Sequence, residues 1–224
     1  MHVELLYHTP DPERAVATAA RLCYAPVGAS ELMETLSDEK IAHVLDTVIS
    51  SGHLSTLEHA SYTFAIEGVS RAMTHQLVRH RLASYNQQSQ RYVTFSDEPE
   101  FVCPQSVVDA GAQQLFDDAV QAAFEAYRAL VDAGVPAEDA RYLLPNACES
   151  KIVVTMNIRE LLHFFSLRCC NRAQWEIRAV ACKMLELARP TAPRIFAAAG
   201  PGCVRGACPE GKMSCGQPWE RAEG

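Results

Sequence analysis

The sequence lacks the patterns that mark several common functional classes. No apolar run reaches the roughly 20 residues that a membrane-spanning helix requires. There is no Gly-x-Gly-x-x-Gly fingerprint and no phosphate-binding loop of the Walker type, which excludes a Rossmann unit as the holder of a cofactor. The Gly-x-Ser-x-Gly elbow of serine hydrolases is missing too, as is any internal repeat. Any cofactor must therefore be held by arginines and loops.

The start of the sequence, Met1-His2-Val3-Glu4, lacks the basic residues and apolar segment of a secretory signal. We therefore expect a cytoplasmic protein. Its nine cysteines are odd in number and scattered, so we expect reduced thiols, most of them acting as small buried hydrophobes. They are Cys23, Cys103, Cys148, Cys169, Cys170, Cys182, Cys203, Cys208 and Cys215.

Length and periodicity predict a mixed fold. The 224 residues suit one domain, which we place at 1–200, followed by an irregular tail at 201–224 that has no apolar period. Alternating apolar residues indicate strands, and apolar residues three or four apart indicate helices. We expect strands at 3–8, 60–69 and 151–156, and helices at 12–23, 37–52, 71–81, 113–132, 136–145, 158–168 and 173–187. The helix at 113–132 has the clearest apolar stripe, formed by Leu115, Ala119, Ala122, Ala126 and Leu130.

Residues 79–92 form a cationic stretch inside an acidic chain. The net charge is -7, yet no carboxylate lies between Glu67 and Asp97. Clustered guanidinium groups repel one another unless an anion joins them. The four arginines of this window are Arg71, Arg79, Arg81 and Arg91.

These residue types suit a ligand with phosphate and heterocycle groups. Guanidinium forks match phosphate oxygens, and we add Arg141 and Arg168 to the candidates. The side-chain amides at 86–90 match the polar edges of a heterocycle. Two alternatives stay open: a merely solvated face at a helix end, and a module that binds RNA phosphates. The net charge of -7 argues against the RNA module.

Two groups of potential metal ligands have unusual spacing. His53, Glu58 and His59 fit no strong metal pattern. In the tail, Cys-x4-Cys-x6-Cys is wider than the usual Cys-x2-Cys pairs and would need a fourth ligand from elsewhere. The alternative is a flexible tail with free thiols, and we predict no metal in the functional site.

The run Arg79-His80-Arg81-x-x-Ser84-x-Asn86-x-x-Ser89-x-Arg91 resembles the signature of the flavin-dependent thymidylate synthases. Residues 52–59, 134–145, 157–168 and 173–177 resemble further segments of that family in the same order. The resemblance covers most of residues 50–180. It implies an α+β fold with an antiparallel sheet and long helices.

The resemblance also implies an activity: methylation of dUMP to dTMP, with methylenetetrahydrofolate as the carbon donor. NADPH would reduce a bound FAD, which delivers hydride. The family resemblance further implies a homotetramer with active sites shared between subunits. From the net charge and the lack of long apolar runs, we expect no nucleic-acid or membrane partner. Activation of dUMP would be non-covalent, without an enzyme nucleophile, although Ser89 alone would suggest one.

The resemblance assigns site residues by position. Arg168 would be catalytic, because a guanidinium beside the uracil ring favours negative charge on it. His53 would line the folate or nicotinamide entrance. The flavin would contact Ser55, Arg79, His80, Arg81, Gln87, Asn157, Arg159 and His163. The dUMP would contact Gln76, Leu77, Val78, Arg79, Gln87, Gln88, Ser89, Gln90, Arg91, Arg141 and Arg168.

Two positions depart from the pattern of some family members. Gln87 stands where those members have Glu, and His163 stands where they have Asn. Gln87 keeps an acceptor but loses the charge, and His163 gains a titratable ring. We expect these differences to change individual contacts and to leave the activity intact.

Overall fold

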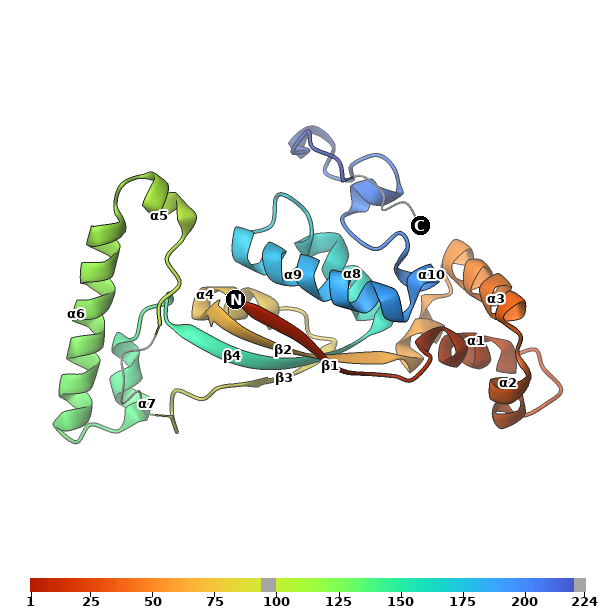
Figure 1. The fold of residues 1–224 in the computed structure, drawn as a ribbon, viewed down its shortest axis with the longest axis horizontal. Helices are drawn as coiled ribbons and strands as arrows, with labels where there is room; N and C mark the ends of the chain where they lie inside the picture. Colours follow the sequence, from red (N-terminus) through yellow and green to blue (C-terminus); the bar gives the residue numbers. More distant parts are fainter. Residues whose placement is uncertain (94–99, 220–224) are drawn as a thin grey trace. The chain divides into compact units, whose positions relative to one another are not determined.

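The computed structural model describes residues 1–93 and 100–219. A four-stranded antiparallel sheet in the order β1-β2-β4-β3 forms the centre of an α+β fold, which confirms the predicted fold class (Figure 1). The strands are β1 His2–His8, β2 Ser61–Ser70, β3 Ala83–Gln87 and β4 Glu149–Asn157.

The chain forms two compact units, and each of the four strands contributes residues to both. The α6 unit comprises Met1–His2, Ile66–Arg79 and Tyr85–Val153, and the α8 unit comprises Val3–Ala65, His80–Ser84 and the chain from Val154 onward. The α6 unit contains helices α4 Arg71–Leu77, α5 Gln105–Asp109, α6 Gln113–Asp132 and α7 Ala137–Ala140. The α8 unit contains helices α1 Pro12–Leu22, α2 Ala29–Thr35, α3 Asp38–Ser51, α8 Ile158–Arg168, α9 Trp175–Ala188 and α10 Pro193–Phe196.

Five short 3-10 helices complete the described secondary structure. They are η1 Leu54–His59, η2 Arg141–Leu143, η3 Arg189–Thr191, η4 Gly202–Arg205 and η5 Gly211–Met213. The last two interrupt an otherwise irregular tail. The division into a domain at 1–200 and a tail at 201–224 stays a prediction. None of the helices in the described ranges is long and apolar enough to cross a membrane.

Local sequence signals fix several helix ends as predicted. The Ser37 side chain caps α3 by accepting a hydrogen bond from the Lys40 amide. Gly52 ends α3 in the left-handed region, at a φ of 74°, where a side chain would be strained. Asn157 caps α8 by accepting from the Glu160 amide at 2.9 Å. This last cap sets where α8 begins after β4.

The α8 unit has an aromatic core on one face of β2. Tyr62 and Phe64 are fully buried, as the alternating sequence of β2 predicts. The Tyr62 ring packs edge-on against Phe196, with 5.7 Å between centroids, and Phe196 packs against Phe165 of α8 at 6.2 Å. Helices α8 and α9 pack side by side over this core (Figure 1). This packing positions α8, which carries Arg159, Glu160, His163 and Arg168 of the site described below.

Some expected details were wrong. The stripe proposed for α6 is exposed at Leu115 (73%), and the buried side chains of α6 are Val120, Phe124 and Tyr127. Alanines dominated the proposed stripe, whereas the larger side chains gain more from burial. Helix α4 ends at Leu77, so Arg79-His80-Arg81 follows the helix and is not its last turn. Helices α2 and α5 and strand β3 are not among the predicted elements.

Candidate functional site

A chain of hydrogen bonds links three polar side chains of the α8 unit. The His80 Nδ1 atom lies 3.1 Å from Glu160 Oε1, and Arg168 Nε donates to His80 Nε2 at 3.0 Å. An arginine nitrogen can only donate, so His80 Nε2 carries no proton. His80 is therefore the neutral tautomer with its proton on Nδ1, which it donates to Glu160. We call this chain Glu160–His80–Arg168 the relay.

Burial stabilises this tautomer of His80. The side chains of His80 and Glu160 are only 4% and 5% exposed. The His80 ring packs edge-on against Phe164, with 4.9 Å between centroids. Burial lowers the pKa of His80, and the charges of Arg168 and His163 lower it further, while Glu160 opposes the shift. The imidazole thus stays neutral and holds the Arg168 guanidinium by its Nε edge.

The relay predicts that turnover decreases at acid pH, which is the acid limb of a pH–rate profile. Because the folded-state pKa of His80 lies below its ordinary value of 6.5, the unfolded chain binds more protons as the pH falls below that value. Stability from neutral His80 is present above pH 6.5 and is lost at lower pH. Protonation also removes the acceptor for Arg168. We expect turnover to fall at acid pH, and a His80→Gln variant to lose that limb in pH–rate profiles.

His80, Glu160 and His163 also hold potential metal-ligand atoms within 4.8 Å of one another. A metal ion on His80 Nε2 would have to displace Arg168 Nε and lie beside its positive charge. The relay accounts for the geometry of these side chains with hydrogen bonds alone. The expectation that the functional site uses no metal stays a prediction.

Glu160 is a site residue that sequence reasoning missed. In the sequence, Glu160 stands three residues after Asn157, which is the spacing of a capping box with the carboxylate folded back on the helix start. The structure instead directs the carboxylate to His80. No sequence signal could have found this contact, because the two residues are 80 positions apart.

Other predicted flavin residues lie in the α8 unit. Ser55 and His53 line a cavity of about 480 Å³ together with Arg21, a volume typical of small-molecule sites. Arg159 pairs with Glu58, and both are about half exposed. The side-chain oxygen of Asn157 caps α8. The other two predicted flavin residues of this unit, His163 and Arg81, are exposed, and Arg81 forms no ion pair with a described carboxylate.

In the α6 unit, Gln87 is held by two hydroxyl groups. Its Nε2 atom donates to Thr74 Oγ1 at 2.9 Å and to Ser150 Oγ at 2.8 Å. Thr74 already donates its own hydroxyl proton to the Arg71 carbonyl, so its oxygen needs a donor, which the Gln87 amide supplies and a glutamate would not. The departure at Gln87 therefore has a local structural explanation.

Two arginines of the α6 unit repel each other electrostatically. Burial lowers the pKa of Arg71, and the positive charge of Arg141 lowers it further. Neither guanidinium forms an ion pair with a carboxylate in the described ranges. Like charges held together in this way favour an anion between them. Sequence reasoning placed Arg71 in the acid-free window but did not assign it to the site, although that window was the available signal.

The remaining predicted dUMP residues differ in accessibility. Arg91 pairs with Glu138 at 2.7 Å, and Ser89 Oγ accepts from the Arg91 amide at 3.1 Å. Leu77 is fully buried and its carbonyl accepts from the Tyr85 hydroxyl, so it could meet a ligand only through its backbone. The others are Gln76, Gln88 and Gln90, which are partly buried, and Val78 and Arg79, which are exposed.

The cysteine beside Arg168 is not an activated nucleophile. Cys169 is fully buried, and its pKa is raised by a hydrogen bond with Cys182 and by burial. Cys148 is also fully buried, and burial raises its pKa to about 11. Both therefore stay protonated thiols. This chemistry is compatible with the non-covalent activation that the sequence suggested.

Comparison with known proteins confirms the family prediction. The family model described as thymidylate synthase complementing protein matches residues 4–194. A flavin-dependent thymidylate synthase of Geobacter sulfurreducens is 63% identical over 222 residues, covering 98% of this chain and 96% of the relative. One of Clostridium tetani is 48% identical over 234 residues, covering 97% and 94%.

A solved structure agrees with the fold. The UMP/dUMP methylase PolB from Streptomyces cacaoi, bound with 5-Br dUMP, superposes with a TM-score of 0.75 and 28% identity. The match covers 87% of this chain and 92% of that one. Sequence and structure comparisons thus point to the same group of proteins.

Proposed function

Because this chain belongs to the thymidylate synthase complementing protein family, we propose that it methylates dUMP to dTMP in a flavin-dependent reaction. Methylenetetrahydrofolate is the proposed carbon donor and NADPH the proposed reductant. The observation that carries the proposal is the family match over residues 4–194, which includes the stretch 79–92 and Arg168.

The residues present suit a flavin dinucleotide. FAD carries a pyrophosphate, and Arg79 and Arg81 are exposed cations without an ion pair to a described residue. Ser55 faces a cavity of about 480 Å³. We propose that these residues hold the FAD together with Gln87, Asn157, Arg159 and His163. When bound, the flavin supplies hydride. The relay uses both ring nitrogens of His80, so we propose that His80 contacts the flavin only through its ring carbons or its backbone.

For dUMP, we propose different tasks for the arginines. Arg71 and Arg141 of the α6 unit bind the phosphate, because their like charges need an anion. Arg91 and Ser89 support the same contact. Arg168 places a guanidinium beside the pyrimidine, where it favours negative charge and makes the ring carbon more nucleophilic. The relay keeps that guanidinium oriented. No thiolate is needed.

The assembly and location are further parts of the proposal. A homotetramer with shared active sites follows from the family resemblance, and light scattering on the purified protein would measure its mass. The cytoplasm is the proposed location.

The visible absorption spectrum of the purified protein tests the proposal. We expect flavin bands that shift when dUMP is added, because dUMP changes the surroundings of the bound flavin. A colourless protein that takes up no added FAD would contradict the proposal. If that protein also bound RNA with a steep salt dependence, the alternative of an RNA-binding module would replace it.

A further inference from the structure

We propose that four cysteines of the α8 unit bind one zinc ion: Cys170, Cys203, Cys208 and Cys215. The last three belong to the tail, and Cys170 lies just after α8. The ion would tie the tail to the loop between α8 and α9. The site uses none of the residues proposed for FAD and dUMP, but it lies beside one of them: Cys170, Cys203 and Cys208 line a cavity of about 300 Å³ together with Arg168.

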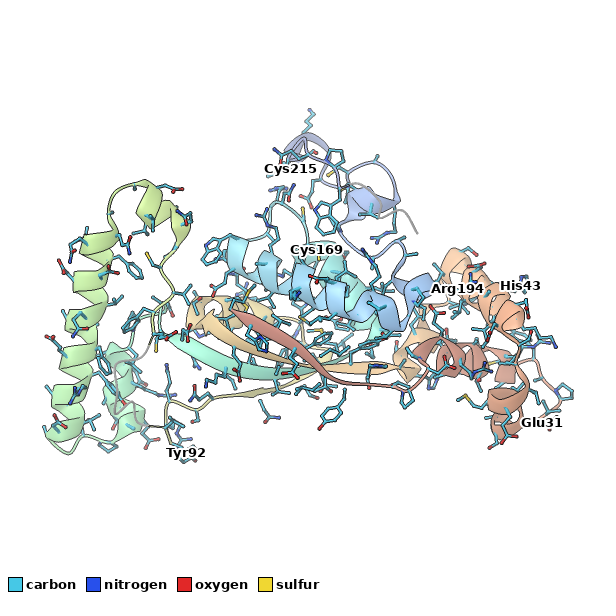
Figure 2. The ribbon with its side chains drawn as sticks, viewed as in Figure 1. Glu31, His43, Tyr92, Cys169, Arg194 and Cys215 are labelled. Atoms are coloured by element: carbon cyan, nitrogen blue, oxygen red, sulfur yellow. The ribbon has the colours of Figure 1, made fainter. Side chains whose placement is uncertain are left out.

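The tail folds back so that all four cysteines line one cavity. The sequence alone supplied only three of them and left the fourth ligand unknown. Cys170 is the proposed fourth ligand, although it precedes Cys203 by 33 residues in the sequence. Cys215 lies on the tail, in the same unit as the α8 helix (Figure 2). Four cysteines are the ligand set of a closed structural zinc site.

The size of the cavity suits a single ion. Its volume is about 30 Å³, enough for a water-sized group and little more. An iron–sulfur cluster with its inorganic sulfides would need more room, and an organic ligand would need far more. A lone tetrahedral ion with four sulfur ligands is therefore the better fit.

Hydrogen bonds already point at two of the sulfur atoms. The Trp219 amide donates to Cys203 Sγ at 3.4 Å, and Asn171 Nδ2 lies 4.0 Å from Cys215 Sγ. N–H donors of this kind stabilise negative charge on sulfur and are typical of the surroundings of metal ligands. Arg172 and Glu210 also line the cavity, but they form an ion pair with each other and add no net charge to it.

The sulfur atoms must move closer together to share an ion. Among the described residues, only the His80 group has three potential ligand atoms within 4.8 Å of one another. The tail can make this adjustment, because Gly206, Gly211 and Gly216 interrupt the segment between and after its cysteines, all with positive φ. All four cysteines are free thiols, as metal binding requires.

Metal analysis of the full-length protein, purified from zinc-supplemented cells under reducing conditions, tests the site. We expect about one zinc per native chain and a drop of at least about tenfold in Cys208→Ser, because a closed site needs its four ligands. Cys103→Ser is the matched control: Cys103 is also partly buried but lies in the α6 unit, so zinc should be unchanged. Cys208→His should retain zinc, since imidazole replaces thiolate.

Several outcomes would overturn the site. Zinc that is absent from the native chain, or that is unchanged in Cys208→Ser, rules it out, and zinc lost only from His163→Ala assigns the metal to the His80 group. Iron in place of zinc overturns the choice of metal. If Cys208→Ser precipitates, Co2+ titration of the native chain decides: intense thiolate-to-metal absorption supports the site, and its lack refutes it. Flavin absorbance recorded on the same samples reports on the proposed function separately.

Discussion

Replacing Arg168 with alanine is expected to lower dTMP formation by roughly 10²–10³-fold while flavin stays bound. Loss of one positioned donor for developing charge typically costs this much. In the structure, the Arg168 guanidinium is held at 3.0 Å from His80 Nε2, and His80 and Glu160 are almost fully buried. The side chain is therefore pre-positioned, and its removal leaves α8 otherwise intact. Single-turnover product analysis and the flavin spectrum measure the two effects separately.

Arg194→Ala is the matched control for this prediction. Arg194 is an exposed arginine of α10 in the same unit, and Figure 2 shows it apart from Cys169, the residue that follows Arg168. It should keep full activity and full flavin content. Loss of flavin together with activity in Arg168→Ala would show that Arg168 holds the cofactor. Unchanged dTMP formation would remove Arg168 from the reaction altogether.

Breaking the relay at Glu160 is expected to slow turnover by about 10–100-fold. A hydrogen bond to a charged group contributes about 1.5–3 kcal/mol, and each 1.4 kcal/mol is a factor of ten. Glu160→Leu leaves the His80 Nδ1 proton without its acceptor, so the imidazole and Arg168 lose their fixed orientation. Glu160→Gln keeps an acceptor oxygen and should retain most of the activity. Because Glu160 acts through His80, kcat should fall while flavin content stays constant.

A purely structural role for Glu160 would give a different pattern. Glu160→Leu would then lower the melting temperature and the yield of protein, but surviving molecules would turn over normally with the native pH profile. Glu186→Leu is the control, since Glu186 is an exposed acid on α9 that pairs with Lys183. It should change neither kcat nor the acid limb.

The sequence was sufficient for features that depend on local chemistry. The Ser37 cap, the glycine stop at Gly52 and the Asn157 cap follow from side-chain and backbone preferences within a few residues. The alternation of β2 also predicted its buried face. In the site, the stretch 79–92 was found because its cationic composition is unusual in an acidic chain, and the role of Arg168 came from the family resemblance.

The missed features depend on contacts between distant segments. The side-chain amides of β3 indicate a loop by composition. The segment forms a strand because β4 provides hydrogen-bonding partners for its backbone. Just after β3, for example, the backbone N–H of Gln88 donates to the carbonyl of Lys151. The Glu160 carboxylate accepts a hydrogen bond from His80, which lies 80 positions earlier in the sequence. Cys170 lines a cavity together with the tail cysteines. No periodicity encodes such pairings, so only the folded chain reveals them.

Product formation by the purified protein tests the central claim most directly. The protein is incubated with FAD, dUMP, methylenetetrahydrofolate and NADPH, and the nucleotides are separated and identified by mass. The account predicts dTMP in the complete mixture and none when the folate or the reductant is omitted. A protein that binds FAD and dUMP but forms no dTMP in the complete mixture would contradict it.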